Sequence, residues 1–264
     1  MTQALLLAAA GCVVYGLAAV LQAVAAARRT GVAALLHPLY LLGLVLDLGA
    51  FVLAYFALEH LPVFLVNAIL AASIAVTVLA ARVLMGARLR PVDGAAVVVV
   101  VAGSVLLAQA SGHQAAAPPP SDFTTVIVIA TAVLTLATIL GWRFAPGWAL
   151  AAISGVGFAL VTIAARGAQG SESDIFAAWP LLLCLLVGAV IAALAQLRAF
   201  QRGGVGMVVS VANGVTVIAA ALVGLLYLGD AVVAGRMWAF ILGMALTLAG
   251  CIVLAFSPAM KVAA

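Results

Sequence analysis

The chain has 264 residues, of which 68% are hydrophobic and only 7% are charged. A soluble globular domain carries about a quarter charged residues, so this composition excludes a water-soluble globular protein. The formal net charge of +4 comes from basic residues that stand singly between apolar runs. No basic patch with interleaved aromatic residues occurs, which excludes a nucleic-acid-binding surface. We therefore expect an all-α polytopic membrane protein that is surrounded by the lipid bilayer.

Apolar runs long enough to cross about 30 Å of hydrocarbon recur along the whole chain. Charged residues, Pro and Gly interrupt these runs, and the interruptions predict about nine transmembrane helices. The predicted spans cover residues 3–27, 37–58, 62–85, 92–110, 123–141, 146–166, 177–199, 204–228 and 233–256. The first span is not preceded by basic residues and has no clear cleavage site, so we expect it to be retained.

Basic residues are distributed unequally between the two sides of the predicted bundle. Nine Lys and Arg residues fall on the side that holds the C-terminus, and only Arg166 and Arg236 fall on the other. Cytoplasmic loops carry the excess of basic residues, so we expect the N-terminus outside and the C-terminus inside. Ten Arg against one Lys, with frequent Ala and Val, favours a GC-rich bacterial source and hence the cytoplasmic (inner) membrane.

The two halves of the chain show internal similarity. Three short segments of the first half match segments of the second at offsets of 143, 142 and 147 residues. The matching spans, 1–4 and 6–9, are shifted by five, an odd number, so the halves would cross the membrane in opposite directions. We expect two inverted-topology repeats over residues 1–110 and 146–264, joined by a Pro-rich external linker and a bridging fifth span over 111–145. Secondary transporters commonly have this plan.

Two stretches of the sequence carry a family pattern. The first is "YFALEHLPVFLVNAILAASIAVTVLAARVLMGARLRPVDGAAVVVVVAGSVLLA" (55–108), in which a long Ala/Val span, a polar turn and a Gly-containing span follow one another. The second is "QLRAFQRGGVGMVVSVANG" (196–214), followed by "LYLGD". The chain resembles the EamA-like group of the drug/metabolite transporter superfamily. The nine spans and the segment "YGLAAVLQAVAAARR" (15–29) are most similar to the branch of NIPA-like magnesium transporters. The resemblance implies a helical transporter fold and leaves the substrate open.

Asp47 is the candidate for ion coupling. It lies near the middle of the predicted second span, where a carboxylate costs roughly 2.5–3.5 kcal/mol on insertion scales. A carboxylate at this depth is typical of a proton- or cation-coupled carrier. The alternative is a buried carboxylic acid that only forms a hydrogen bond to another helix.

Polar residues in other spans are candidates for the same cavity. Ser210, Asn213 and Thr216 are spaced at i, i+3 and i+6 in the eighth span, and we interpret them as one polar stripe that faces a substrate. Asn67 in the third span and Tyr15 in the first are further candidates for the cavity wall. For each of them the alternative is a packing or interhelical hydrogen-bonding role.

Motifs for nucleotide hydrolysis or covalent catalysis are not found. The sequence has no P-loop, HExxH or GxSxG motif and no metal-spaced Cys/His cluster, so we expect neither an enzyme nor a metal site nor a cofactor. The leading hypothesis is a secondary transporter that moves a metabolite, a drug-like molecule or a cation by alternating access, with Asp47 in proton coupling. Two alternatives stay open, a flippase for a lipid or lipid-linked headgroup and a non-transporting membrane scaffold. The sequence also leaves a homodimer open.

Overall fold

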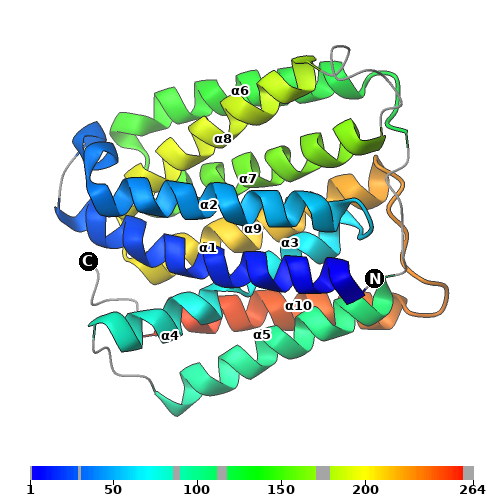
Figure 1. The fold of residues 1–264 in the computed structure, drawn as a ribbon, viewed down its shortest axis with the longest axis horizontal. Coiled ribbons are helices and arrows are strands. Elements are labelled where there is room, and N and C mark those ends of the chain that lie inside the picture. The colour runs from blue at the N-terminus through cyan, green and yellow to red at the C-terminus, as the bar shows by residue number, and fades with distance from the viewer. Residues whose placement is uncertain (1, 29–30, 86–89, 112–117, 171–178, 258–264) are drawn as a thin grey trace.

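The computed structural model describes residues 2–28, 31–85, 90–111, 118–170 and 179–257. These stretches are helical almost throughout, and the β-structure among them is one isolated bridge between Ser111 and Val232. The long helices lie side by side, with the start of the first helix on the right of Figure 1 and the end of the last helix on the left. Long apolar runs favour this arrangement, because every backbone polar group is satisfied within its own helix.

Within the described residues, nine helical stretches are long and apolar enough to cross a membrane, and α3 and α4 together form the third. The nine predicted spans are therefore present, with ends that differ by a few residues. The helices are α1 (Thr2–Arg28), α2 (Pro38–Leu58), α3 (Val63–Ala71), α4 (Ser73–Met85), α5 (Pro91–Ala110), α6 (Phe123–Phe144), α7 (Gly147–Gly170), α8 (Trp179–Phe200), α9 (Val205–Leu226) and α10 (Met237–Ala255), with a short 3-10 helix η1 (Gly31–Leu36) before α2.

The third span is not the single helix that the sequence predicts over 62–85. It is interrupted at Ala72, where the chain makes a turn before α4 begins. The carbonyl oxygen of Ala71 accepts a hydrogen bond from Asn213 Nδ2 of α9 at 3.1 Å, and Cys251 Sγ of α10 lies 3.8 Å from it. Residues 70–74 include no Pro or Gly. Contacts from distant helices therefore stabilise the break, and no local signal in the sequence indicates it.

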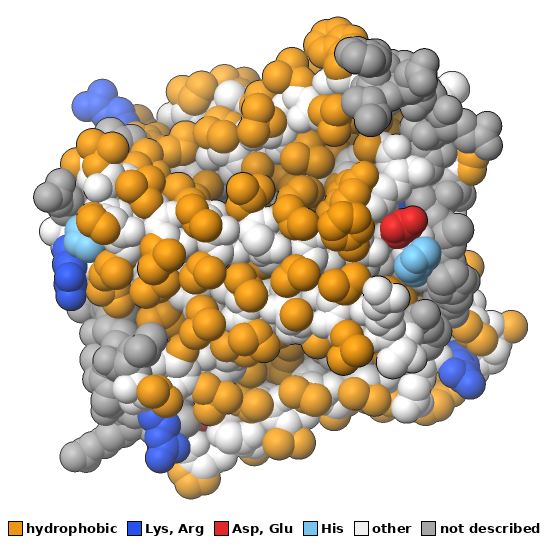
Figure 2. Space-filling view, in the orientation of Figure 1, with side chains coloured by type: hydrophobic (Ala, Val, Ile, Leu, Met, Phe, Trp, Pro, Cys, Tyr) orange, Lys and Arg blue, Asp and Glu red, His pale blue; other side chains and the backbone are white. Residues whose placement is uncertain are grey.

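The lateral surface of the bundle is apolar. Figure 2 shows hydrophobic side chains over the sides of the helices, while charged side chains gather at the two ends. Leu48 and Val45 of α2, for example, are more than half exposed. A soluble monomer rarely exposes a contiguous apolar surface of this extent. The chain is thus built as a multi-pass membrane protein.

Small residues bring the helices into close contact. An added Cβ at Gly103 of α5 would lie 2.5 Å from Oγ1 of Thr247 and 2.8 Å from the carbonyl oxygen of Gly243, both on α10. Helix association in a bilayer depends on such close packing, because lipid tails are as apolar as the side chains and give no hydrophobic driving force. The same pattern explains why the pairs α1–α2, α7–α8 and α5–α10 make the most extensive contacts of the bundle.

Candidate functional site

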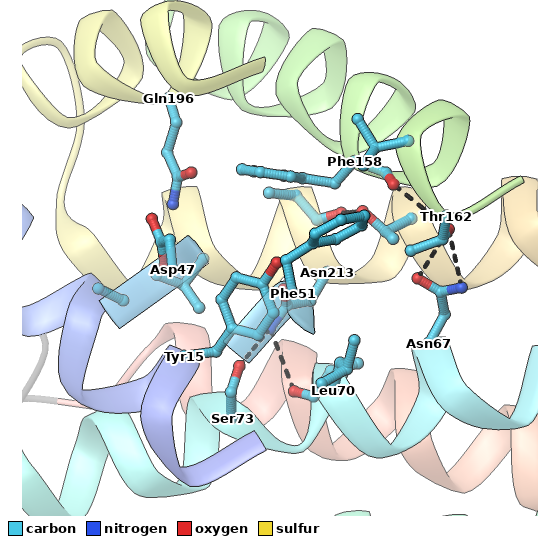
Figure 3. A pocket seen from close by; sticks show the side chains of 16 residues that line it. Tyr15, Asp47, Phe51, Asn67, Leu70, Ser73, Phe158, Thr162, Gln196 and Asn213 are labelled. Atoms are coloured by element: carbon cyan, nitrogen blue, oxygen red, sulfur yellow. Dashed lines mark hydrogen bonds between the residues drawn. The ribbon is translucent and has the colours of Figure 1, made fainter. Parts of the chain in front are cut away.

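A small cavity lies inside the bundle between helices from both halves of the chain. Its volume is about 60 Å³, which has room for about four water molecules. Figure 3 shows the side chains that surround it. The described residues that line it are Tyr15 and Ala19 of α1, Asp47 and Phe51 of α2, Asn67, Leu70, Ala71 and Ser73 of α3 and α4, Phe158, Val161 and Thr162 of α7, Gln196 of α8, and Val209, Ala212, Asn213 and Thr216 of α9.

Asp47 is the single charged side chain among the described residues that line this cavity. Gln22 of α1 donates a hydrogen bond from Nε2 to Asp47 Oδ2. Gly43, one turn earlier on α2, makes this approach possible, because a Cβ there would lie 2.6 Å from Gln22 Cγ. Across the cavity, Gln196 of α8 points its amide toward Asp47 (Figure 3). The Asp47 carboxylate therefore lies between the amide side chains of Gln22 and Gln196. The sequence had identified Asp47 alone of these three as a candidate for ion coupling.

Aromatic side chains form part of the wall. Tyr15, which the sequence proposed as a wall residue, lies there together with Phe51 and Phe158 (Figure 3). Aromatic faces attract cations, and they also exclude water from the carboxylate. The cavity thus combines one acidic group with an apolar, aromatic surround.

Asn67 closes the end of the cavity nearest the start of α3. Its Nδ2 donates to the carbonyl oxygen of Val63 at 2.9 Å and to Thr162 Oγ1 of α7 at 3.1 Å. The two side chains meet directly between their helices (Figure 3). The sequence placed Asn67 at the cavity, and Thr162 is the partner that it missed.

The three residues of the predicted polar stripe of α9 lie in two different surroundings. Asn213 lines the cavity and lies 3.4 Å from Ser73 Oγ, and Thr216 lines it and donates to the carbonyl oxygen of Gly155 at 2.9 Å. Ser210 does not border the cavity and instead donates to the carbonyl oxygen of Cys251 at 2.7 Å. A helix turns about 100° per residue, so positions i and i+6 differ by roughly 120°. Ser210 therefore points toward α10 rather than toward the cavity.

A buried ion pair lies one turn beyond the Asn67–Thr162 contact. Arg166 of α7 and Asp230 of the α9–α10 loop are only 3% and 6% exposed, and Arg166 Nη2 lies 3.7 Å from Asp230 Oδ1. Asp230 Oδ2 also accepts the backbone N–H of Val63 at 2.7 Å, and Arg166 Nη1 donates to the carbonyl oxygen of Leu58. The pair therefore ties α7, the α2–α3 connection and the α9–α10 loop together.

Neither Arg166 nor Asp230 was among the candidate site residues that the sequence indicated. Helix α7 extends to Gly170, four residues past the predicted end of its span, so Arg166 lies within the helix. Burial raises the pKa of Asp230 above its usual range, against the opposing effects of Arg166 and of the N–H of Val63. The charge of this carboxylate is therefore more sensitive to acidification than that of an exposed aspartate.

Within the parts of the chain that the structure describes, no group of three or more His, Cys, Asp or Glu side chains is placed to hold a metal ion. Comparison of the chain with family models, with curated proteins and with solved structures gives no significant match. The assignment of a function therefore depends on the cavity and on the packing of the helices around it.

Proposed function

We propose that the protein is a secondary transporter that moves a small solute across the bacterial cytoplasmic membrane by alternating access, with Asp47 as the coupling residue. The observation that carries the proposal is the cavity within the bundle that has one carboxylate in its wall. Ionisable groups inside membrane proteins mark ion and substrate pathways by default. Ala71 and Ser73, which flank the break in the third span, also line this cavity, and broken helices are common at transporter binding sites.

Matching contacts in the two halves support an inverted repeat of spans 1–4 and 6–9 around α6. Thr77 of α4 donates to the carbonyl oxygens of Gly16 and Ser73, and Thr216 of α9 donates to those of Gly155 and Ala212. Helices α1 and α7, which carry the two glycines, run in opposite directions in Figure 1. The equivalent pairs, each 139 residues apart, are Gly16 and Gly155, Ser73 and Ala212, Val76 and Val215, and Thr77 and Thr216.

This register differs from the offset of 143 residues that sequence similarity gives for the first span. It also bears on the coupling residue. In α1 and α7 this register pairs Gln22 with Val161. Gly43 of α2 lies against Gln22, and Gly188 of α8 lies against Val161. Gly43 therefore corresponds to Gly188, and Asp47, four residues later, corresponds to Ala192. The polar pair of Gln22 and Asp47 is therefore present in one half only. A group that the repeat does not duplicate is easier to explain by chemistry than by the requirements of the fold.

Two interhelical contacts close one end of the bundle, and this closure supports alternating access. The Asn67–Thr162 contact and the Arg166–Asp230 pair lie in succession between the cavity and the N-terminal end of the bundle. At the opposite face, Arg28, Arg143 and Arg198 lie in the last turns of their helices and Arg202 follows α8. These basic residues favour the N-terminus outside. In the proposed orientation, the structure represents a state closed toward the outside, and transport requires these two contacts to separate.

The lining favours a cation, a zwitterion or a proton over an anion. No Lys, Arg or His is among the described residues that line the cavity, and Asp47 shares the cavity wall with the aromatic side chains of Tyr15 and Phe158 (Figure 3). An anion would meet a carboxylate without a compensating positive charge. A solute larger than a few water molecules requires the two halves to move apart, which is the motion that alternating access supplies.

A scaffold without transport activity is the second candidate function. The hydrogen bond from Gln22 to Asp47 favours it, because a carboxylate paired to a neighbouring helix has a structural role. A lipid flippase needs a cavity open sideways to the bilayer. Instead, α9 separates this cavity from the membrane-facing groove that is lined by Gly214 and Leu248.

Transport assays with a cavity-filling variant distinguish these functions. Proteoliposomes are offered a panel of radiolabelled small amines and amino acids. We expect uptake by the wild type and its loss in Ala19→Phe, because the Phe ring would occupy the cavity that Ala19 lines. Gly49→Leu is the matched control, since a Cβ at Gly49 meets no atom within 4 Å. Equal uptake by wild type and Ala19→Phe would contradict transport through this cavity.

A further inference from the structure

A second hollow lies on the opposite side of α9 from the cavity. It is an apolar groove between α9 and α10 with a volume of about 600 Å³, within the roughly 300–1,000 Å³ of sites for drug-sized ligands. Gly206 and Gly214 leave room along α9. A Cβ at Gly214 would lie 3.6 Å from Leu248 Cδ2, so the groove could accept a side chain there. Its walls are formed mainly by Met207, Val211, Ile218, Leu248, Ile252 and Phe256.

The lining of this groove suits a hydrocarbon chain. Ser210 carries the hydroxyl group in the lining, and this group already donates to the carbonyl oxygen of Cys251 at 2.7 Å. The groove lies along two apolar spans, so acyl chains of the bilayer are its immediate surroundings. An acyl chain gains no hydrophobic free energy by moving from lipid to protein. Selectivity must therefore come from the fit of the chain and from the headgroup.

A basic side chain lies at one end of the groove. Arg90, before α5, donates from Nη2 to the carbonyl oxygen of Phe256 at 2.9 Å, and its side chain is 49% exposed. Asp93 Oδ1 lies 3.5 Å from the guanidinium, while Asp93 Oδ2 is bound to Ser257 Oγ at 2.9 Å and to the backbone N–H of Arg90 at 2.8 Å. A guanidinium has five N–H donors, so the exposed side of Arg90 retains donors for a phosphate oxygen.

We propose that this groove is a binding site for an anionic phospholipid, with one acyl chain between α9 and α10 and the phosphate at Arg90. The proposal needs only the placement of α9 and α10 in a bilayer and does not depend on transport. One basic residue near the membrane surface gives about a fivefold preference for an anionic lipid. We expect that preference for phosphatidylglycerol over phosphatidylcholine with identical acyl chains.

The test is an equilibrium titration of the purified protein with each of these two lipids, followed by native mass spectrometry. Arg90→Gln is expected to abolish the fivefold preference and to leave phosphatidylcholine binding unchanged. Arg143→Gln is the matched control, because Arg143 ends α6, which makes no extensive contact with α10. Gly214→Leu is expected to weaken the first binding event for both lipids about tenfold, while Gly49→Leu is expected to retain it.

Three results would overturn the proposal. The first is a phosphatidylglycerol preference that persists in Arg90→Gln, and this result is decisive even if Gly214→Leu does not fold. The second is wild-type lipid binding by a folded Gly214→Leu protein, with folding checked by thermal unfolding. The third is a dimer that excludes lipid and dissociates in Gly214→Leu, which would assign the groove to a second copy of the chain.

Discussion

At the scale of single residues, Arg166 and Asp230 form a buried ion pair that links α7 to the α2–α3 connection and to the α9–α10 loop. Removing one charge of such a pair leaves the other buried without compensation, which costs about 3–5 kcal/mol. Asp230→Asn keeps an oxygen that can accept the N–H of Val63, so the variant isolates the loss of charge. We expect a lower free energy of unfolding by about that amount, measured by thermal unfolding in detergent.

The control for this prediction is Glu59→Gln, which removes an exposed carboxylate in the α2–α3 connection. It should leave the melting temperature unchanged. A double variant, Arg166→Met with Asp230→Leu, should be more stable than Asp230→Asn, because no charge is left unpaired. Equal stability of wild type and Asp230→Asn would show that the pair does not hold this end of the bundle.

Asn213 gives a second prediction at this scale. Its Nδ2 donates to the carbonyl oxygen of Ala71 at the break in the third span. Asn213→Ala leaves that oxygen without its amide partner, and an unsatisfied buried acceptor costs about 1–3 kcal/mol. We expect that loss in the free energy of unfolding, and no loss for Thr125→Ala on the exposed face of α6. Matching melting curves for wild type and Asn213→Ala would contradict the role given to this hydrogen bond.

Some of these residues could be predicted from the sequence and others could not. Asp47 is visible because it is a charge within an apolar run, and Asn67 and Asn213 are visible as polar groups in apolar spans. Gln22, which binds Asp47, lies 25 residues away near a span end. Its role depends on which faces of α1 and α2 meet, and the spacing of residues in a uniformly apolar helix does not determine that.

At the scale of helices, the contacts α1–α4 and α7–α9 depend on one glycine each. An added Cβ at Gly16 would lie 2.5 Å from Val76 Cβ, and one at Gly155 would lie 3.0 Å from Val215 Cβ. Overpacking of this kind costs about 1–3 kcal/mol. We expect Gly16→Ala and Gly155→Ala to lower the free energy of unfolding by similar amounts, because the two contacts are equivalent in the proposed repeat.

Gly49→Ala is the matched control on a lipid-facing helix surface. Ala is favoured over Gly in a helix by about 1 kcal/mol, and nothing lies within 4 Å of the added Cβ. This variant should therefore be as stable as the wild type or more stable. A destabilised Gly155→Ala beside an unaffected Gly16→Ala would contradict the equivalence of the two contacts.

The positions of the helices follow from the sequence more completely than their interruptions do. Apolar runs bounded by Arg28, Pro38, Pro62 and Pro91 fix the first spans to within a few residues. The break at Ala72 depends on Asn213, which lies more than a hundred residues later in the chain. Because tertiary hydrogen bonds stabilise the break, the residues next to Ala72 in the sequence do not indicate it.

At the scale of the whole molecule, the proposed orientation is testable by cysteine labelling. The described cysteines Cys12, Cys184 and Cys251 are buried, whereas Glu59 and Arg143 are exposed at opposite ends of the bundle. In intact cells, a membrane-impermeant thiol reagent should label Glu59→Cys and should label Arg143→Cys only after permeabilisation. The reverse pattern would place the N-terminus inside.

In the proposed mechanism, Asp47 couples solute movement through the cavity to a proton gradient. The direct measurement is solute accumulation in proteoliposomes with and without an imposed pH gradient, for wild type, Asp47→Asn and the control Glu59→Gln. We predict that the gradient drives accumulation in the wild type and in Glu59→Gln but not in Asp47→Asn, which cannot release or bind the proton. Gradient-driven accumulation that is unchanged in Asp47→Asn would show that Asp47 is not the coupling residue.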